Sequence, residues 1–194
     1  MKKAKLIAIT GGIGAGKSVV SSILRTAGYG VYDCDQRARE LMNTLPSIKD
    51  ALIEKFTPEI YIDGELNRKL LSDIIFNDPE ALIFVNNIVH PQVREDIMLW
   101  FSKQEIDISF VETAILKEGG IDKMVDSVWN VTAPLETRIK RVMARNGIPR
   151  EKVIERINNQ QTDLDCDGDK IVEIVNDGTT ALLPQIFQVL KKDS

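Results

Sequence analysis

The sequence has little of several features that would mark a specialised protein. Two of its 194 residues are cysteines, Cys34 and Cys166, and they lie too far apart in the chain to form a disulfide framework. A reduced, cytoplasmic setting is therefore expected. No apolar run is long enough to cross a bilayer, and the run after residues 1–3 is too short for the core of a signal peptide. We therefore expect neither a membrane partner nor export.

An excess of basic residues is also missing. The chain has 25 Lys and Arg against 29 Asp and Glu, a net charge of −4, so a nucleic-acid partner is not expected and any anion site must be local. No internal repeat or low-complexity tract is present. The hydrophobic content of 43% and the charged content of 28% are those of an ordinary globular protein, and the length suits one α/β domain with insertions.

The stretch from residue 5 to residue 28 contains the clearest pattern. Residues 5–10 form a short apolar run, as expected of a buried strand. Residues 11–18 fit the phosphate-binding pattern Gly-x-x-x-x-Gly-Lys-Ser/Thr. Apolar residues at helical spacing then predict a helix over 17–27, with Gly28 as its C-cap. A Gly-rich turn with a chance Lys-Ser is the alternative, but the position between a strand and a helix favours phosphate binding.

Each residue type in this loop has a physical role. Glycines let the backbone curl so that successive N–H groups point inward, and the positive end of the next helix dipole lies at the same place. Lys17 adds a mobile cation for the β- and γ-phosphates, and Ser18 offers a hydroxyl to Mg²⁺. The loop therefore predicts binding of a nucleoside triphosphate. It does not distinguish a kinase from a GTPase or a motor.

Two aspartates follow the second expected strand. The strand covers 30–32, and Asp33 and Asp35 come directly after it. Ligands of open parallel sheets bind beyond the carboxyl ends of the strands, so both acids are candidates for Mg²⁺ and for the phosphate acceptor. The alternative is a turn or an N-cap, because Asp is favoured at helix starts and Asp35 could cap a helix over 36–43.

Helical segments dominate residues 36–104, and no strand is expected there. We interpret this insertion as a subdomain on the substrate side of the protein. Arg39, Arg68 and His90 are candidates for acceptor contacts, with a solvated helix face or a helix flank as an equal alternative. For Arg94 the solvated face is favoured. The expected helices cover 36–43, 47–55, 67–76, 79–88 and 91–103.

Three further strands complete the predicted core. They cover 106–112, part of 126–131, and 170–175, and a last helix covers 181–192. Glu112 ends its strand, where acids that order Mg²⁺ commonly lie, and a cap for the following helix is an equal alternative. We predict an α/β fold of the P-loop NTPase type, with three layers, a five-stranded parallel sheet, a helical insertion and a helical lid. The expected parts of this single domain are the core (1–35, 105–135 and 168–194), the acceptor-binding subdomain (36–104) and the lid (136–167).

The predicted lid begins with a basic helix over 134–146. Arg138, Arg141 and Arg145 fall at i, i+3 and i+7 and therefore share one face. A charged run is usually a solvated face, but like charges at this spacing repel one another, and a polyphosphate would relieve that repulsion. We therefore expect Arg141 and Arg145 to face phosphate.

Two polar turns follow the basic helix. The loop 163–169 resembles the start of a calcium loop but lacks the Glu at the twelfth position, so we interpret it as a polar connector. The turn 176–178 closes the fifth strand and would line an adenine pocket. A plain left-handed turn is an equal alternative there.

Together these motifs resemble one family, the dephospho-coenzyme A kinases, over nearly the whole chain. Many kinases share the loop, whereas Asp-x-Asp, His-Pro and the lid arginines in this order are much more specific. The resemblance rests on Thr10 to Ser18, Asp33-Cys34-Asp35 with Ala38-Arg39, Asp63-Gly64 with Arg68, Ile75-Phe76-Asn77, His90-Pro91, Arg138, Arg141, Arg145, Gln160, Asn176 and Gly178.

The resemblance implies an ATP-dependent phosphorylation of the ribose 3′-hydroxyl of dephospho-coenzyme A, which gives coenzyme A and ADP, with Mg²⁺ as cofactor. The resemblance implies that Asp35 holds this hydroxyl. Because the transition state of phosphoryl transfer is loose, Asp35 mainly orients the hydroxyl and accepts its proton late. The implied catalytic residues are Asp35, Lys17, Arg141 and Arg145; the implied metal-binding residues are Ser18 and Asp33; the implied acceptor-binding residues are Asp35, Arg39, Arg68 and His90; and the implied ATP-binding residues are Gly12, Ile13, Gly14, Ala15, Gly16, Lys17, Ser18, Val19, Arg141 and Asn176.

Two positions and one segment depart from the family pattern. Val19 stands where Thr or Ser is common, so a hydroxyl toward the α-phosphate is missing, and Cys34 replaces a small Ala. Residues 114–118 keep only Glu118 and an apolar pair of the common Pro-Leu-Leu-Phe-Glu. The alternative functions are another P-loop kinase of a small molecule or a nucleoside monophosphate, and a GTP switch. No Asn-Lys-x-Asp motif for guanine follows a late strand. A monomer or small homo-oligomer is expected.

Overall fold

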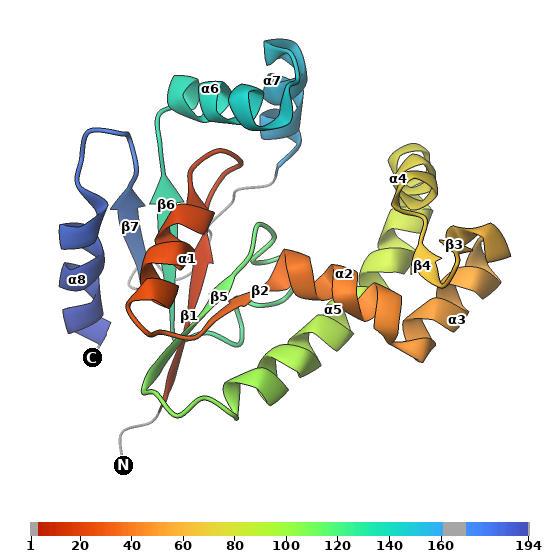
Figure 1. Cartoon of the computed structure of the whole chain (residues 1–194), viewed down its shortest axis with the longest axis horizontal. Helices are drawn as coiled ribbons and strands as arrows, with labels where there is room; N and C mark the ends of the chain where they lie inside the picture. Colours follow the sequence, from red (N-terminus) through yellow and green to blue (C-terminus); the bar gives the residue numbers. More distant parts are fainter. Residues whose placement is uncertain (1–3, 161–169, 194) are drawn as a thin grey trace. The chain divides into compact units, whose positions relative to one another are not determined.

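The computed structural model describes residues 4–160 and 170–193, and the chain divides into two compact units (Figure 1). The core unit comprises Met1–Asp33 and Phe101–Ser194, and the helical unit comprises Cys34–Trp100. The helical unit begins two residues earlier and ends four residues earlier than the predicted subdomain over 36–104. The predicted connector over 163–169 lies outside the described residues.

A five-stranded parallel sheet forms the centre of the core unit. Its strand order is β2-β5-β1-β6-β7, so β1 is the middle strand. Ile9 of β1 pairs with Glu112 on one side and with Trp129 on the other. The predicted sheet is confirmed. Its strands are β1 (Lys5–Thr10), β2 (Val31–Asp33), β5 (Ile108–Glu112), β6 (Ser127–Thr132) and β7 (Ile171–Val175).

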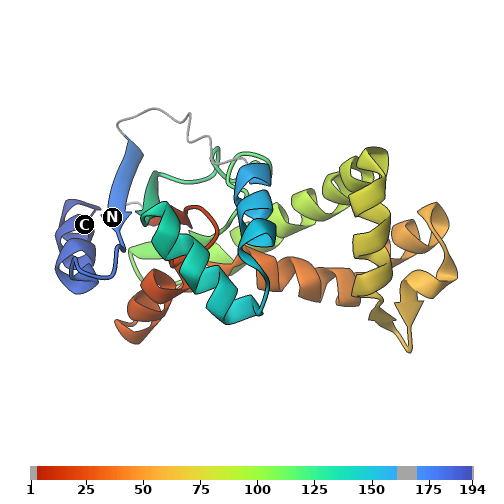
Figure 2. The same ribbon diagram turned by 90° about the horizontal axis from the view of Figure 1, so that it is seen from above.

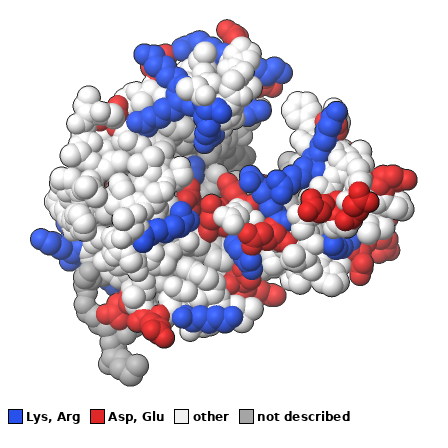
Figure 3. Space-filling view, in the orientation of Figure 1, with Lys and Arg blue, Asp and Glu red and all other residues white. Residues whose placement is uncertain are grey.

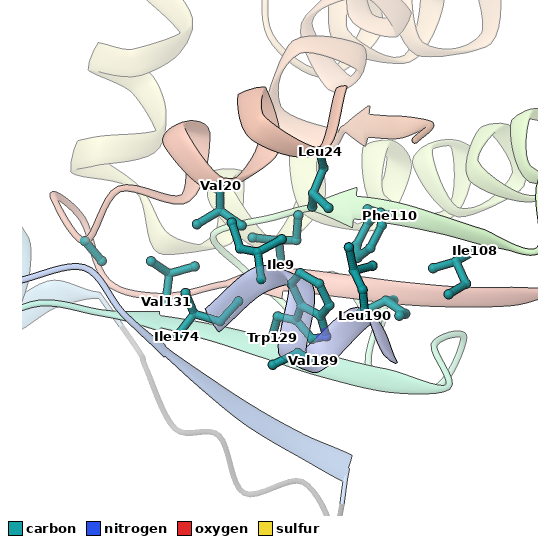
Figure 4. Close-up of a cluster of buried hydrophobic side chains, with 13 residues drawn as sticks. Ile9, Val20, Leu24, Ile108, Phe110, Trp129, Val131, Ile174, Val189 and Leu190 are labelled. Carbon is teal, nitrogen blue, oxygen red and sulfur yellow. The ribbon is translucent and has the colours of Figure 1, made fainter. Parts of the chain in front are cut away.

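The main hydrophobic core lies between this sheet and helices α1 (Lys17–Thr26) and α8 (Leu182–Asp193) (Figure 4). The middle strand is buried from its second residue to its last, which is why it reads as a continuous apolar run and not as an alternating one. Phe110 and Trp129 pack edge-on with ring centroids 4.9 Å apart, and both are fully buried. This packing fixes the strand ends that carry the loop between β1 and α1.

A helical hairpin follows β6 and lies over the loop between β1 and α1 (Figures 1 and 2). It consists of α6 (Leu135–Asn146) and α7 (Arg150–Asn159). The two helices share a small core of their own, built on Ile139, Val142 and Val153. We call this hairpin, together with the C-cap residue of its second helix, Gln160, the lid. Its first helix is the predicted basic helix, shorter by one residue at its start.

The helical unit corrects three of the sequence predictions. The expected helices over 79–88 and 91–103 are one helix, α5 (Pro79–Phe101), which continues through Pro91. Buried apolar side chains recur every four residues on both sides of this proline, so tertiary packing outweighs the lost hydrogen bond. The recurring side chains are Val85, Val89, Val93 and Ile97.

The expectation of no strand within residues 36–104 is wrong. Strands β3 (Tyr61–Ile62) and β4 (Glu65–Leu66) form a short antiparallel hairpin. The two residues between them, Asp63 and Gly64, have φ angles of 52° and 84°, as an Asp-Gly hairpin turn requires. A two-residue strand is too short to give an alternating pattern, so the sequence shows the turn without the strands.

The N-cap alternative for Asp35 is also wrong. Helix α2 (Cys34–Thr44) begins two residues earlier than predicted, and Asp35 therefore lies within its first turn. The other elements of the unit are α3 (Pro46–Lys55), the short helix η1 (Pro58–Ile60) and α4 (Arg68–Asn77). Over the part of the chain that the structure describes, no helix combines the length and the apolar character that a membrane span needs.

Candidate active site

The loop over residues 11–18, here the phosphate loop, connects the carboxyl end of β1 to the amino end of α1. Two of its glycines are required by the space around them. Gly11 has a φ of 143°, and a Cβ there would overlap the carbonyl oxygen of Val131. Gly16 is the N-cap of α1 with a φ of 100°, and a Cβ there would overlap Nδ2 of Asn176. Both positions combine left-handed backbone with close approach, which only glycine tolerates.

Several carbonyl groups of the phosphate loop are paired from within the loop and α1. Lys17 Nζ donates to the Gly11 carbonyl at 2.9 Å. The Ala15 N–H donates to the Gly12 carbonyl at 3.0 Å, and the Val19 N–H donates to the carbonyl of the N-cap residue at 3.0 Å. These bonds close the curl of the backbone and keep Lys17 against it.

Two further carbonyls of the loop are paired from outside it. Arg138 Nε donates to the Ile13 carbonyl at 2.9 Å, and Asn176 Nδ2 donates to the Ala15 carbonyl at 2.8 Å. Arg141 Nη1 lies 3.3 Å from the Ala15 carbonyl and 3.0 Å from the backbone carbonyl of Asn176. Side chains from the lid and from the end of β7 therefore fix the outer surface of the phosphate loop.

The three predicted lid arginines do not all contact the phosphate loop. Arg138 and Arg141 contact the phosphate loop, and burial lowers the pKa of Arg138. Arg145 is exposed, and its Nε donates to Asn146 Oδ1 at 2.8 Å. Figure 3 shows further basic side chains gathered over the lid. The exposed basic residues of α6 and α7 are Lys140, Arg145, Arg150, Lys152 and Arg156.

Two carboxylates lie together at the carboxyl edge of the sheet. Asp33 pairs with Glu112 in the register of β2 and β5. Burial raises the pKa of Glu112, and the Asp33 charge raises it further, whereas Ser21, Lys17 and Arg25 oppose the rise. The negative charge of a carboxylate that is buried beside another carboxylate is poorly compensated. The site therefore favours binding of a cation.

The donor set here suits a Mg²⁺ ion that keeps water and substrate oxygens as ligands. No group of three His, Cys, Asp or Glu side chains with metal-binding geometry occurs in residues 4–160 and 170–193. Ser18 is exposed at the start of α1, and Asp33 and Glu112 end their strands. Magnesium in nucleotide enzymes is typically held by one or two protein oxygens plus phosphates and water, so these residues fit it.

A cavity of about 310 Å³ lies beside the phosphate loop within the core unit. Its wall includes Gly11 and Gly12 of the loop, residues 114–118 after β5, and Arg138 and Gln160 of the lid. A Cβ at Gly12 would overlap the Arg138 guanidinium, so the arginine lies directly on the loop. From the sequence, Gln160 was identified only as a landmark of the family, and no role was predicted for it. Its position at the end of α7, directly over the loop, is visible only in three dimensions.

The predicted acceptor residues lie in the helical unit, on three of its helices. Asp35 and Arg39 are exposed one turn apart on α2, and therefore share a face. Arg68 is the first residue of α4, which Asn67 caps through a hydrogen bond to the Leu70 N–H. His90 is half-buried within α5.

The sequence gave no sign of the ion pair that holds α2 on α5. Arg37 donates to both carboxylate oxygens of Asp96, from Nε at 2.9 Å and from Nη2 at 2.8 Å. A two-point pair of this kind fixes direction as well as distance. It therefore sets the orientation of the helix that carries Asp35. A long-range pairing such as this one has no periodic signal in the sequence.

The family model and the curated relatives indicate one family. The family model for dephospho-CoA kinase matches residues 5–181. A dephospho-CoA kinase of Bacteroides fragilis strain YCH46 is 39% identical over 186 residues, which cover 95% of this chain and 90% of the relative. The solved structure of TT1252 from Thermus thermophilus superposes with a TM-score of 0.80 at 34% identity, over 99% of this chain and 97% of that one. A solved dephospho-CoA kinase from Campylobacter jejuni has a TM-score of 0.68 at 23% identity, over 97% and 96% of the two chains, and supports the fold alone.

Proposed function

This chain belongs to the dephospho-CoA kinase family and is an ATP-dependent kinase, and from that premise we propose how its own residues act. The reaction is the transfer of the γ-phosphoryl group of ATP to the ribose 3′-hydroxyl of dephospho-coenzyme A, giving coenzyme A and ADP. The observation that best supports it is the phosphate loop, whose carbonyls are paired and whose lysine lies against it. Such a loop is built to hold a polyphosphate at a helix N-terminus.

We assign the triphosphate to the phosphate loop, with residues 12–19 as its contacts. Lys17 stabilises charge on the transferring phosphoryl group, and Arg145, exposed on the lid, is the second cation assigned to that charge. Arg141 and Asn176 support the loop through its outer carbonyls and face the nucleotide from there. Val19 is half-exposed and offers no hydroxyl, so its side chain has no group that could donate a hydrogen bond to the α-phosphate.

We assign the acceptor to the helical unit. Asp35 accepts a hydrogen bond from the 3′-hydroxyl and aims it at the γ-phosphorus, in line with the leaving oxygen. The new O–P bond forms as the bond to the β-phosphate oxygen breaks, and the hydroxyl proton passes late to the Asp35 carboxylate. Arg39, Arg68 and His90 are proposed to hold the phosphates and ribose of the acceptor.

Magnesium is proposed as the cofactor, held by Ser18 and, directly or through water, by Asp33 and Glu112. When bound, it would offset negative charge on the β- and γ-phosphates. We also propose a cytoplasmic enzyme that is a monomer or small homo-oligomer. The buried thiol of Cys34 suits a reduced compartment.

The test is a coupled assay of ADP release with and without dephospho-coenzyme A. We expect acceptor-dependent ADP release by the wild type. Asp35→Asn should lose phosphoryl transfer while Mg·ATP affinity, measured by calorimetry, stays near wild type, because the amide cannot accept the proton. Asp63→Asn, at an exposed turn of the same unit, is the matched control. Wild-type turnover by Asp35→Asn would refute its role.

A different acceptor is the competing outcome of the same assay. Another small-molecule or nucleoside monophosphate kinase would release ADP with its own acceptor and none with dephospho-coenzyme A. Measuring ADP release against a panel of alcohols and nucleoside monophosphates therefore separates the two functions.

A further inference from the structure

One residue of the phosphate loop, Ile13, contacts the lid through its side chain and through both of its backbone groups. Its side chain packs against the small core of the lid, formed by Ile139, Val142 and Val153. Its carbonyl accepts from Arg138 Nε at 2.9 Å. Its N–H donates to Gln160 Oε1 at 2.6 Å. The lid therefore contacts this one residue in three different ways.

The lid also approaches the next residue closely. A Cβ at Gly14 would lie 2.6 Å from the backbone carbonyl of Arg138 and 2.9 Å from a methyl group of Val142. Helix α6 thus rests on the loop backbone itself at this point. A shift of the lid must therefore either move the residues of the loop apex or separate from them.

Gln160 connects three segments that are far apart in the sequence. It follows α7 as its C-cap residue, in extended backbone conformation. Its Oε1 accepts from the Ile13 N–H, and its Nε2 donates to the carbonyl of Ala114, just after β5, at 3.4 Å. One amide side chain therefore connects the end of the lid, the apex of the phosphate loop and the segment that follows the strand of Glu112.

We propose that Gln160 is a positioning residue for phosphoryl transfer. It holds the apex of the phosphate loop at Ile13 against the lid, and so keeps the loop in the shape that binds the triphosphate. An amide suits this task because it donates and accepts at once, and a neutral group adds no charge beside the phosphates. The proposal rests on the proposed kinase function only for the final phosphoryl transfer, since binding of ATP alone also reports on it.

A purely structural role is the alternative, because Gln160 also ends helix α7. A structural residue would lower stability and would affect both substrates alike. A positioning residue of the loop should affect ATP and leave the acceptor unaffected, because neither of its hydrogen bonds reaches the helical unit.

The experiment compares two variants of the full-length chain with a control. Gln160→Leu keeps much of the side-chain volume and removes both hydrogen bonds. Gln160→Glu keeps an acceptor for the Ile13 N–H and, at neutral pH, removes the donor to Ala114. Asn159→Leu changes an exposed amide on the adjacent residue of the same helix end and serves as the matched control. Each protein is measured by calorimetry with Mg·ATP alone, by steady-state kinetics for both substrates, and by thermal unfolding.

For Gln160→Leu we expect ATP affinity and kcat/KM for ATP to fall about tenfold, as for the loss of two neutral hydrogen bonds. The KM for dephospho-coenzyme A and the melting temperature should stay near the wild-type values. The ATP affinity of Gln160→Glu should lie between the values of Gln160→Leu and the wild type. The ATP affinity of Asn159→Leu should match that of the wild type.

Three results would overturn the proposal. The first is unchanged ATP affinity in Gln160→Leu. The second is an equal loss for both substrates together with a lower melting temperature, which indicates a structural role. The third is an equal loss in Asn159→Leu. If the wild type binds ATP but does not phosphorylate dephospho-coenzyme A, the proposed function fails while the calorimetric comparison still tests Gln160.

Discussion

Asn176 gives the sharpest test of how the phosphate loop is held. Its side chain is buried, with 7% of the residue exposed. Nδ2 donates to the Ala15 carbonyl at 2.8 Å, and Oδ1 accepts from Arg141 Nη2 at 3.3 Å. Its own N–H donates to the Thr132 carbonyl at 2.7 Å, so the backbone anchors the residue independently of the side chain. Asn176→Ala therefore removes only the two side-chain bonds.

The expected cost follows from the loss of both side-chain bonds, which leaves the Ala15 carbonyl with only the longer bond from Arg141 Nη1 at 3.3 Å. The loss of two hydrogen bonds costs about 1–3 kcal/mol. For a chain of this size, a loss of about 2 kcal/mol in the free energy of unfolding lowers the melting temperature by roughly 4–8 °C. The affinity for Mg·ATP should fall as well, because Ala15 lies within the loop that binds the phosphates.

Urea unfolding, thermal unfolding and calorimetry with Mg·ATP check this prediction. Asn176→Asp is the stricter variant, since a carboxylate would face the Ala15 carbonyl and repel it at neutral pH. Glu173→Gln is the control. It changes an exposed residue of β7 that accepts a hydrogen bond from Thr132, and it should shift stability by less than about 0.5 kcal/mol. An Asn176→Ala protein with unchanged stability and unchanged ATP affinity would refute the reasoning.

Two further predictions concern groups inside the site. Lys17→Ala should lower kcat/KM by about 10²–10³-fold, the usual loss when a donor to transition-state charge is removed, and a value close to wild type would exclude Lys17 from the reaction. Glu112→Gln should raise the melting temperature of the ligand-free protein near neutral pH. The pKa of the wild-type carboxyl is raised in the folded state, so its contribution to stability is full below 4.5, the ordinary value, and is lost as the pH rises through the folded value. Thermal unfolding across this pH range should show the two proteins converging at low pH, and a constant difference would contradict the prediction.

The sheet and the phosphate loop could be predicted from the sequence because their signals are local. The apolar run before the loop, the spaced glycines and the helical period after them all lie within about one supersecondary unit. The predicted first strand, 5–10, agrees with β1 (Lys5–Thr10), and the predicted helix 17–27 differs from α1 by one residue. The short hairpin at Asp63 and the unbroken α5 were missed, since their stability comes from packing around them and not from local pattern.

The site was harder to predict because long-range contacts decide its details. Spacing showed that Arg138, Arg141 and Arg145 share a face, but it could not show which of them meet the loop. Gln160 and Asn176 bond to residues 147 and 161 positions away in the chain, respectively. No periodicity connects such positions. The resemblance to a family named Gln160 without a contact. Asn176 was expected from its turn and from the resemblance to bind ATP, and not to support the phosphate loop.

The geometry of the loop explains why the lid is basic on its inner side. A backbone that curls to aim N–H groups at a phosphate turns its carbonyl groups the other way, and each carbonyl then needs a donor. The row of arginines supplies those donors to Ile13 and Ala15. Carbonyl oxygens of the loop therefore offset the repulsion between Arg138 and Arg141, even without a bound triphosphate. It follows that charge repulsion argues for a phosphate ligand most directly at Arg145, at the exposed end of the row. The contact of Arg141 with the nucleotide stays a prediction, because its bonds to the loop carbonyls do not exclude it.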